Sequence, residues 1–202
     1  MAFLTFDDGP SKTTLQILEI LKQEDIKATF FVLGSEVEKY PEIVKKIYED
    51  GHYIANHGYS HVYSIIYESP EAVLTEYNQC NDLIRKAIGE PEYNSNIFRF
   101  PGGSIGGKHA ELKNQAIELL RQNNIEHLDW NALNGDAETN DLTIEFELQR
   151  LADTTQNKQS IVVLMHDAYA KNVTAEALPQ IISQLREQGY EFKSMYDVLN
   201  NK

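Results

Sequence analysis

The sequence predicts an α/β fold, a single (β/α) barrel with about seven parallel strands. Short β-rich runs alternate with longer helical patterns, and such strand-helix-strand units favour right-handed crossovers and parallel pairing. No low-complexity segment, long linker or internal repeat interrupts this alternation over the 202 residues. One core of this size can bury roughly 70% of the surface of the unfolded chain. We therefore expect residues 1–202 to form one domain.

The strands are predicted where β-branched and aromatic residues cluster between turn signals. In chain order the predicted strands are Phe3–Phe6, Ala28–Leu33, Tyr53–Asn56, Ile97–Phe100, His127–Ala132, Ser160–His166 and Tyr190–Lys193. Because the run Ile161–Met165 is entirely apolar, we expect its strand to be central and buried on both faces.

The helices are predicted from apolar residues at helical spacing and from capping residues. Ser69 is a predicted N-cap, with Pro70 at the first helical position and Gly89 as the stop. The other predicted helices are Thr13–Gln23, Pro41–Glu49, Glu111–Asn123, Leu142–Asn157 and Ala175–Gln188.

Charge and cysteine content exclude several classes of protein. The chain has 31 acidic and 18 basic residues, a formal net charge of −13, which disfavours binding to nucleic acid or an anionic membrane. Cys80 is the single cysteine, so an intrachain disulfide or an all-cysteine metal site cannot form. No apolar run approaches the roughly 20 residues that span a bilayer. We expect a soluble chain without an export signal, and no protein partner is indicated.

Polar side chains that could carry chemistry follow the predicted strands, at the edge where α/β proteins place their sites. Asp7 and Asp8 follow the first strand, directly before a Gly-Pro turn. Two carboxylates this close resist ionising together unless a cation neutralises one of them. The alternative is an Asx turn that places negative charge at a helix N-terminus.

His57 and His61 follow the third strand and are four residues apart. This separation would place both imidazoles on one side of a helical turn, which suits binding to Zn²⁺ or a similar ion. The spacing alone is weak evidence. Together with Asp8, the pair forms a His₂Asp set that leaves coordination positions open, as in catalytic metal sites.

Other polar residues are expected at the same edge. Arg99 closes the fourth strand, Asp129 and Asp136 belong to the fifth strand region, and His166 ends the sixth. His166 is a candidate general acid or base, and a hydrogen-bonded structural histidine is the alternative. The remaining histidines are predicted to be structural or solvated, and they are His52, His109 and His127.

Four segments contain most of these candidates. They are Thr5-Phe6-Asp7-Asp8-Gly9-Pro10, His57-Gly58-Tyr59-Ser60-His61, Arg99-Phe100-Pro101-Gly102-Gly103 and Leu164-Met165-His166. In order and approximate spacing they resemble the polysaccharide deacetylase family, the NodB-type carbohydrate esterases. The first segment is highly specific, the last is moderately specific, and the resemblance spans nearly the whole chain.

The resemblance implies a deformed (β/α) barrel that removes acetyl groups from a polysaccharide with one divalent metal ion, Zn²⁺ or alternatively Co²⁺. It implies that Asp8, His57 and His61 bind the metal, that Asp7 is the general base and that His166 is the general acid. The implied reaction is N-deacetylation of N-acetylglucosamine in peptidoglycan or chitin-like polymers.

The resemblance also implies supporting roles. Arg99 would orient the general base, Leu164 would line the pocket for the acetyl methyl group, and the Gly102 N–H would help to bind the oxyanion. Aligning the family's fourth motif makes Asp136 the partner of the catalytic histidine, with Asp129 as the alternative. Many members have an aromatic residue at the position of Gly102, so we expect a more open groove here.

Other functions remain as alternatives. The reaction could be O-deacetylation of acetylxylan, or the chain could be a non-catalytic carbohydrate-binding relic of the fold. The segment from Gly102 to Lys108 also matches the start of a phosphate-binding loop, but His109 stands where that loop needs Ser or Thr. Polymeric substrates imply the extracellular space or cell surface, so the chain would be an excised catalytic domain.

Overall fold

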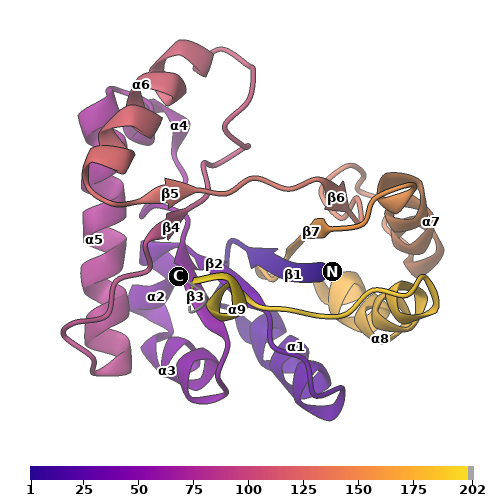
Figure 1. The fold of residues 1–202 in the computed structure, drawn as a ribbon. Coiled ribbons are helices and arrows are strands. Elements are labelled where there is room, and N and C mark those ends of the chain that lie inside the picture. The colour runs from indigo at the N-terminus through magenta and orange to yellow at the C-terminus, as the bar shows by residue number, and fades with distance from the viewer. Residues whose placement is uncertain (200–202) are drawn as a thin grey trace.

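The structure is a computed structural model that describes residues 1–199, so residues 200–202 of the predicted domain lie outside the described part. Its centre is a seven-stranded parallel sheet in the order β5-β4-β3-β2-β1-β7-β6 (Figure 1). The strands are β1 (Ala2–Asp7), β2 (Thr29–Val32), β3 (Tyr53–Asn56), β4 (Ile97–Phe98), β5 (Glu126–His127), β6 (Ala132–Leu133) and β7 (Ile161–His166). The predicted α/β class with about seven parallel strands is confirmed.

Alternate residues of the strands face opposite sides of this curved sheet, as the two-residue period of a strand requires. In β1, Leu4 and Phe6 belong to the large core between the sheet and its helices, whereas Phe3 belongs to a second cluster on the other face. Asp7 is four residues after Phe3 and therefore lies on the same face of the sheet as Phe3. Strand β7 pairs with β1 along its whole length, and its last residue, His166, lies opposite Asp7 in the register.

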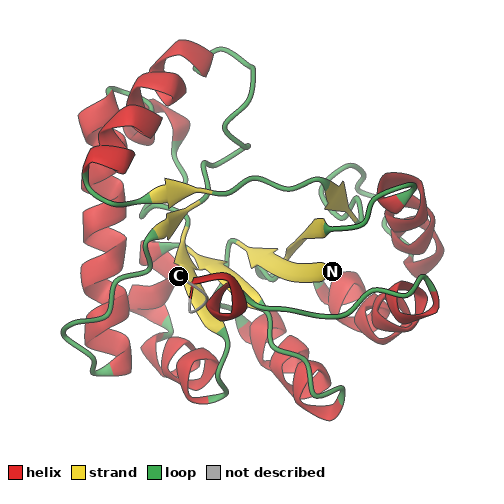
Figure 2. Cartoon of the chain, in the orientation of Figure 1, coloured by secondary structure: helices red, strands yellow, loops and turns green. Residues whose placement is uncertain are grey.

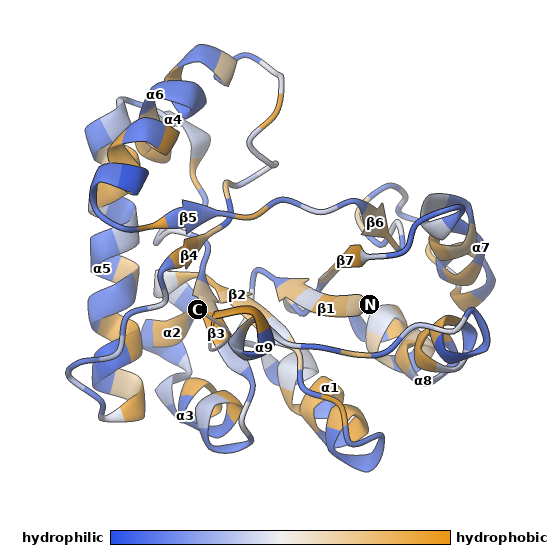
Figure 3. Cartoon of the chain, viewed as in Figure 1, coloured by the Kyte–Doolittle hydropathy of each residue, from blue (hydrophilic) through white to orange (hydrophobic). Residues whose placement is uncertain are grey.

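Nine helices within residues 1–199 surround the sheet. They are α1 (Lys12–Gln23), α2 (Gly34–Lys39), α3 (Pro41–Glu49), α4 (Tyr63–Ile66), α5 (Pro70–Ile88), α6 (Ala110–Gln122), α7 (Ile144–Thr155), α8 (Asn172–Glu187) and α9 (Met195–Leu199). Their sides differ in hydropathy, as Figure 3 shows for α1, α5 and α8. Helices α2, α4 and α9 were not predicted, because they are too short for an apolar period to be recognised.

The capping residues define the long helices as predicted. Ser69 accepts a hydrogen bond from the Ala72 N–H at the start of α5, and Gly89 ends that helix in the left-handed conformation with φ +76°. No helix in the described part of the chain combines the length and the apolar character needed to cross a bilayer.

The predicted strand His127–Ala132 is wrong as one element. Hydrogen bonds to β4 end with the Leu128 N–H, and bonds to β7 begin with the Asn131 N–H, so the segment forms two short strands at opposite edges of the sheet. Figure 2 shows the intervening loop between β5 and β6. The chain itself, rather than a β ladder, therefore connects the two edges of the barrel.

The predicted strand Tyr190–Lys193 is also wrong. Only Phe192 forms a bridge, to Ala2, where the Ala2 N–H donates to the Glu191 carbonyl and the Lys193 N–H donates to the Ala2 carbonyl. After this bridge the chain forms α9, and Met195 packs into the cluster that contains Phe3. The segment ends its pairing early because the chain turns to cover that cluster.

Candidate active site

Three side chains from two loops converge at the carboxyl ends of β1 and β3. The Nε2 atoms of His57 and His61 lie 3.4 and 3.6 Å from Asp8 Oδ1. Two ligands held tetrahedrally at about 2.1 Å from Zn²⁺ lie about 3.4 Å apart, which matches these separations. Asp8 Oδ1 is buried without a hydrogen-bond partner, so a cation would satisfy it. These residues therefore fit a divalent metal ion.

A hydrogen bond and burial keep the His57 imidazole neutral and orient it as a metal ligand. Its Nδ1–H donates to the Arg99 carbonyl over 2.8 Å, which leaves the Nε2 lone pair directed towards Asp8. Burial lowers the pKa of His57 to about 3, and the neighbouring carboxylate offsets only part of this effect. A neutral imidazole can bind a metal without first losing a proton.

The predicted helical turn between His57 and His61 is wrong. The segment is an irregular loop, with φ +83° at Gly58 and φ +57° at His61. Glu76 of α5 shapes it: Oε2 accepts hydrogen bonds from the backbone N–H groups of Tyr59 and Ser60 over 2.8 and 2.7 Å. A buried carboxylate on another element therefore brings the two imidazoles together.

Asp7 lies beside these three residues and is almost fully buried. Arg99 donates from Nη1 to Asp7 Oδ1 and to Thr5 Oγ1, each over 2.8 Å. Burial raises the pKa of Asp7 above its ordinary value, and the charges of Arg99 and His166 offset part of that rise. Asp7 is thus a fixed carboxylate with enhanced proton affinity, as a general base requires.

Arg99 fills the interior of the curved sheet and is fully buried. Its Nε donates to the Leu128 carbonyl over 2.9 Å, and its guanidinium carbon lies 3.9 Å from the centroid of the Phe31 ring. The cation is therefore held by the loop between β5 and β6 and by an aromatic face as well as by Asp7.

His166 forms a tight pair with Asp136. Its Nδ1–H donates to Asp136 Oδ1 over 2.6 Å, and its backbone N–H donates to Oδ2 over 2.8 Å. Burial alone would lower the pKa of His166, but the hydrogen bond and charge of Asp136, with the charges of Asp7 and Asp8, raise it to about 9. The imidazole is therefore protonated at neutral pH, and its Nε2–H remains for proton transfer.

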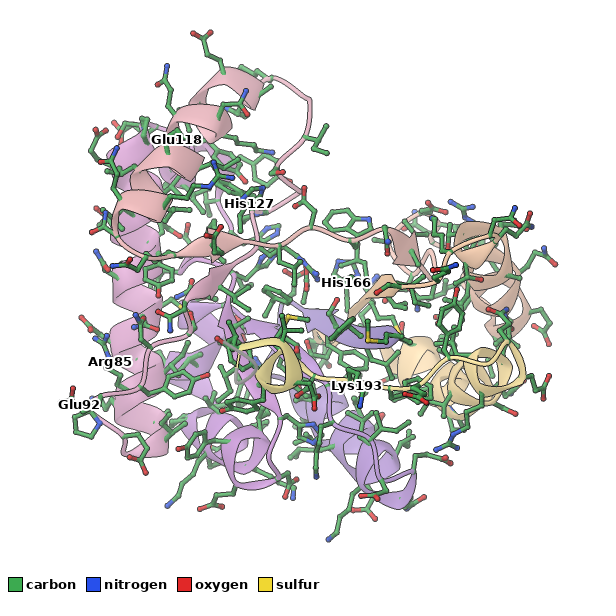
Figure 4. All side chains as sticks on the ribbon, viewed as in Figure 1. Arg85, Glu92, Glu118, His127, His166 and Lys193 are labelled. Carbon is green, nitrogen blue, oxygen red and sulfur yellow. The ribbon has the colours of Figure 1, made fainter. Side chains whose placement is uncertain are left out.

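The structure places Asp136, and not Asp129, against His166. Asp129 instead accepts hydrogen bonds from the Ser104 N–H and hydroxyl, so it fixes the glycine-rich loop after β4. Figure 4 shows His166 at β7, whereas His127 lies at β5, on the opposite arm of the sheet.

Gly102 and Leu164 were predicted to contact the acetyl group, and the structure gives their positions after β4 and on β7. Leu164 is buried on β7, two residues before His166 and therefore on the same side of the strand. Gly102 follows β4 with φ +74°, and no hydrogen bond of its N–H is found within residues 1–199. The Tyr63 hydroxyl occupies the space beside Gly102, where many family members have an aromatic side chain.

A cavity of about 300 Å³ opens beside the candidate metal ligands. Asp8 and His61 line one side of it, and Glu36 and Tyr169 are among the other lining residues. A larger hollow of about 550 Å³ lies around Tyr190, at the amino-terminal end of β7, and includes none of the candidate residues. Of these two hollows, the smaller one adjoins the candidate metal ligands.

The sequence analysis missed two supporting residues. Glu76 was not singled out, although a carboxylate within the apolar stripe of α5 was a usable signal. Thr174 was also missed: its hydroxyl donates to Asp136 Oδ2 over 3.0 Å and lies 3.2 Å from Glu147. Nothing in the sequence marks that threonine, because its role depends on how α8 packs against the loop after β6.

Comparisons with known proteins identify the family of this chain. The profile of the family described as polysaccharide deacetylase matches residues 1–123. A peptidoglycan-N-acetylglucosamine deacetylase from Bacillus cereus is 34% identical over 200 residues, which cover 98% of this chain and 70% of that protein. The peptidoglycan-N-acetylmuramic acid deacetylase PdaC from Bacillus subtilis is 35% identical over 93% of this chain and 36% of its own length.

A solved structure is similar over nearly the whole chain. The catalytic domain of peptidoglycan N-acetylglucosamine deacetylase from Eubacterium rectale superimposes with a TM-score of 0.87 and 32% identity, covering 96% of this chain and 87% of that domain. Family profile, sequence identity and fold agree, so the chain belongs to the polysaccharide deacetylase family.

Proposed function

We propose that this chain is a metal-dependent hydrolase that removes the N-acetyl groups of N-acetylglucosamine residues in peptidoglycan. The observation that carries the proposal is the register of two neighbouring strands. It pairs Asp7 with His166 and so sets a carboxylate and a protonated imidazole beside a His₂Asp cluster. Amide hydrolysis needs such a base and acid on either side of the reacting carbonyl.

The metal site in this proposal consists of Asp8, His57 and His61. Their ligand atoms all lie within 4.8 Å of one another, and the donor set of two imidazoles and one carboxylate suits Zn²⁺, with Co²⁺ as an alternative. When bound, the ion would supply Lewis-acid activation of water and of the acetyl carbonyl.

The proton transfers are assigned to Asp7 and His166. Asp7, oriented by Arg99, takes the proton from the attacking water, and its raised pKa favours this step. His166, held by Asp136, donates its Nε2 proton to the leaving nitrogen, which departs as a free amine. Loss of such an acid or base reduces the rate by about 10² to 10⁴.

Two further groups position the acetyl group. The Gly102 N–H would donate to the oxyanion of the tetrahedral intermediate, and a lost donor of this kind costs about 10² to 10³ in kcat. Leu164 provides a buried apolar surface on the His166 side of β7, suited to the acetyl methyl group. The products are acetate and an amino sugar.

The substrate assignment rests on the relatives. The B. cereus protein and the E. rectale domain are both named for peptidoglycan N-acetylglucosamine, and PdaC is named for N-acetylmuramic acid. The second sugar is therefore the alternative to test, together with acetylxylan. A peptidoglycan substrate places the site of action outside the cytoplasmic membrane, at the cell surface.

The test measures acetate released from chitooligosaccharides, peptidoglycan and acetylxylan, with chelated protein before and after Zn²⁺ or Co²⁺ is added. We expect metal-restored release, greatest for the N-acetylated glycans, and mass spectrometry of digested peptidoglycan identifies the deacetylated sugar. Full release by the metal-free protein would refute the mechanism. Metal binding without release from any substrate would favour the non-catalytic alternative.

A further inference from the structure

One aromatic side chain at the candidate site has no part in the chemistry proposed above. Tyr63 begins α4, two residues after His61, and is 43% exposed. Its ring centroid lies 5.9 Å from that of His61. Its hydroxyl reaches the loop after β4, so the side chain spans from a proposed metal ligand to Gly102.

The space beside Gly102 is already filled by this side chain. A Cβ atom built on Gly102 would lie 2.3 Å from Tyr63 Oη, closer than nonbonded atoms can approach, and 3.3 Å from Tyr63 Cζ, which is a tight contact. Gly102 also has φ +74°, a conformation that strains any other residue type. Tyr63 therefore fills the space that a side chain at position 102 would occupy. We call the Tyr63 ring the aromatic wall, and it comes from α4 rather than from the loop after β4.

Contacts from Tyr67 and Lys113 hold the aromatic wall and the adjacent loop in place. The Tyr67 ring packs edge-on against Tyr63 at a centroid distance of 5.3 Å, and the Tyr67 hydroxyl donates to the Pro101 carbonyl over 2.6 Å. Lys113 donates to the Gly103 carbonyl over 2.6 Å and so fixes the same loop. The Tyr63 hydroxyl itself has no hydrogen-bond partner within residues 1–199.

We propose that Tyr63 is a specificity-determining residue that binds the saccharide beside the reacting acetyl group. Its ring would pack against the apolar C–H face of a pyranose, and its hydroxyl would hydrogen-bond to a sugar oxygen, because tyrosine has an apolar body and a polar tip. This inference rests on the proposed function, since it takes an acetylated glycan as the substrate.

The experiment compares Tyr63→Ala and Tyr63→Phe with the unaltered protein, all loaded with Zn²⁺. Titration calorimetry measures binding of the N-acetylglucosamine tetramer, and acetate release gives KM and kcat separately. Because the contact exists before the reaction begins, Tyr63→Ala should raise Kd and KM about tenfold while kcat changes less. Tyr63→Phe keeps the ring and should retain most of the binding.

Two controls separate contact from structural damage. Ile65→Ala alters an exposed residue of the same short helix, 51% exposed, and should leave binding and turnover unchanged. Titration with Co²⁺ should give equal metal affinity for Tyr63→Phe and the unaltered protein.

The outcomes distinguish this inference from the proposed function. Normal KM and Kd in both Tyr63 variants, with acetate still released, would overturn the inference alone. If the unaltered protein binds the tetramer through Tyr63 but releases no acetate from any glycan, the proposed function falls and only the saccharide contact of Tyr63 stands. A metal-loaded protein that neither binds nor deacetylates the tetramer would overturn both.

Discussion

Replacement of Asp136 by Asn should shift the pH dependence of activity by changing the pKa of His166. In the unaltered protein that pKa is raised from 6.5 to about 9, which corresponds to about 3 kcal/mol in favour of the protonated imidazole. The Asp136 charge and hydrogen bond are the main favourable contributions, and burial opposes them. Without that charge, burial opposes only the weaker contributions of Asp7 and Asp8, so the pKa should fall towards its ordinary value of 6.5.

The expected change at one pH follows from the protonated fraction. At pH 7.5, a pKa of about 9 leaves His166 about 97% protonated, whereas a pKa of 6.5 leaves about 9%, roughly a tenfold loss of active acid. The basic limb of kcat/KM for Asp136→Asn should therefore move down by up to about 2.5 pH units. An ion bound at Asp8 acts on both proteins, so the difference between them is the quantity to measure.

The assay is acetate release by metal-saturated protein from pH 5 to 10, with Asp129→Asn as the matched control. Asp129 binds Ser104 rather than His166, so its variant should keep the basic limb of the unaltered protein. An Asp136→Asn profile that superimposes on the unaltered profile would refute this reasoning, as would an equal shift in the control.

The same pair gives a prediction for stability. The folded pKa of His166 exceeds its unfolded value, so its contribution is fully present below pH 6.5 and is lost as pH rises through about 9. The stability difference between the unaltered protein and Asp136→Asn, measured by urea denaturation, should therefore shrink across this range. A difference that grows with pH would contradict the assignment.

Three further predictions concern the metal, its loop and the core. Asp8→Ala should lose bound metal, measured by elemental analysis, together with activity. Asp7→Asn should keep the metal and lose at least about 10²-fold in kcat. Equal metal loss in both variants would contradict the separate roles of the two carboxylates. Glu76→Ala removes the carboxylate that accepts from two backbone N–H groups of the loop between His57 and His61. It should weaken Co²⁺ affinity on the order of tenfold in spectroscopic titration. Glu71→Ala changes an exposed residue of the same helix and should leave this affinity unchanged. Phe30→Ala removes a fully buried ring whose centroid lies 5.2 Å from that of Phe6. The free energy of unfolding, measured by urea denaturation, should fall by about 3 to 5 kcal/mol. A fall below about 1 kcal/mol would show that the surrounding core closes around the smaller side chain without leaving a cavity.

Much of the fold could be predicted because its strands and long helices have clear periods. The run Ile161–Met165 forms β7, which has a neighbour on each side but is next to the edge strand β6 rather than central, and Val162 is only partly buried. Pro41–Glu49 has the predicted bounds. The segment His127–Ala132 could not be resolved, since its residues read as one continuous strand. Only the positions of β4 and β7 determine where hydrogen bonding stops and begins again.

The candidate site was predictable to a similar degree. The carboxyl ends of parallel strands share one edge, so listing the polar residues there gathered Asp7, Asp8 and His166. The path between His57 and His61 was not predictable, because a side chain of α5 shapes that loop. Such a contact depends on packing between elements and leaves no local pattern.

The sequence by itself determined the fold class, the family and the residues that reach the reactive edge, because strand alternation and strand-end position are local properties of the chain. Only the tertiary structure decided that Asp136 rather than Asp129 holds His166, a contact between residues 30 positions apart. It also decided that Tyr63 supplies the wall beside Gly102. The physical reason is the same for both, since each contact joins a loop residue to the end of a strand or helix that is distant in the sequence, and only packing sets their relative position.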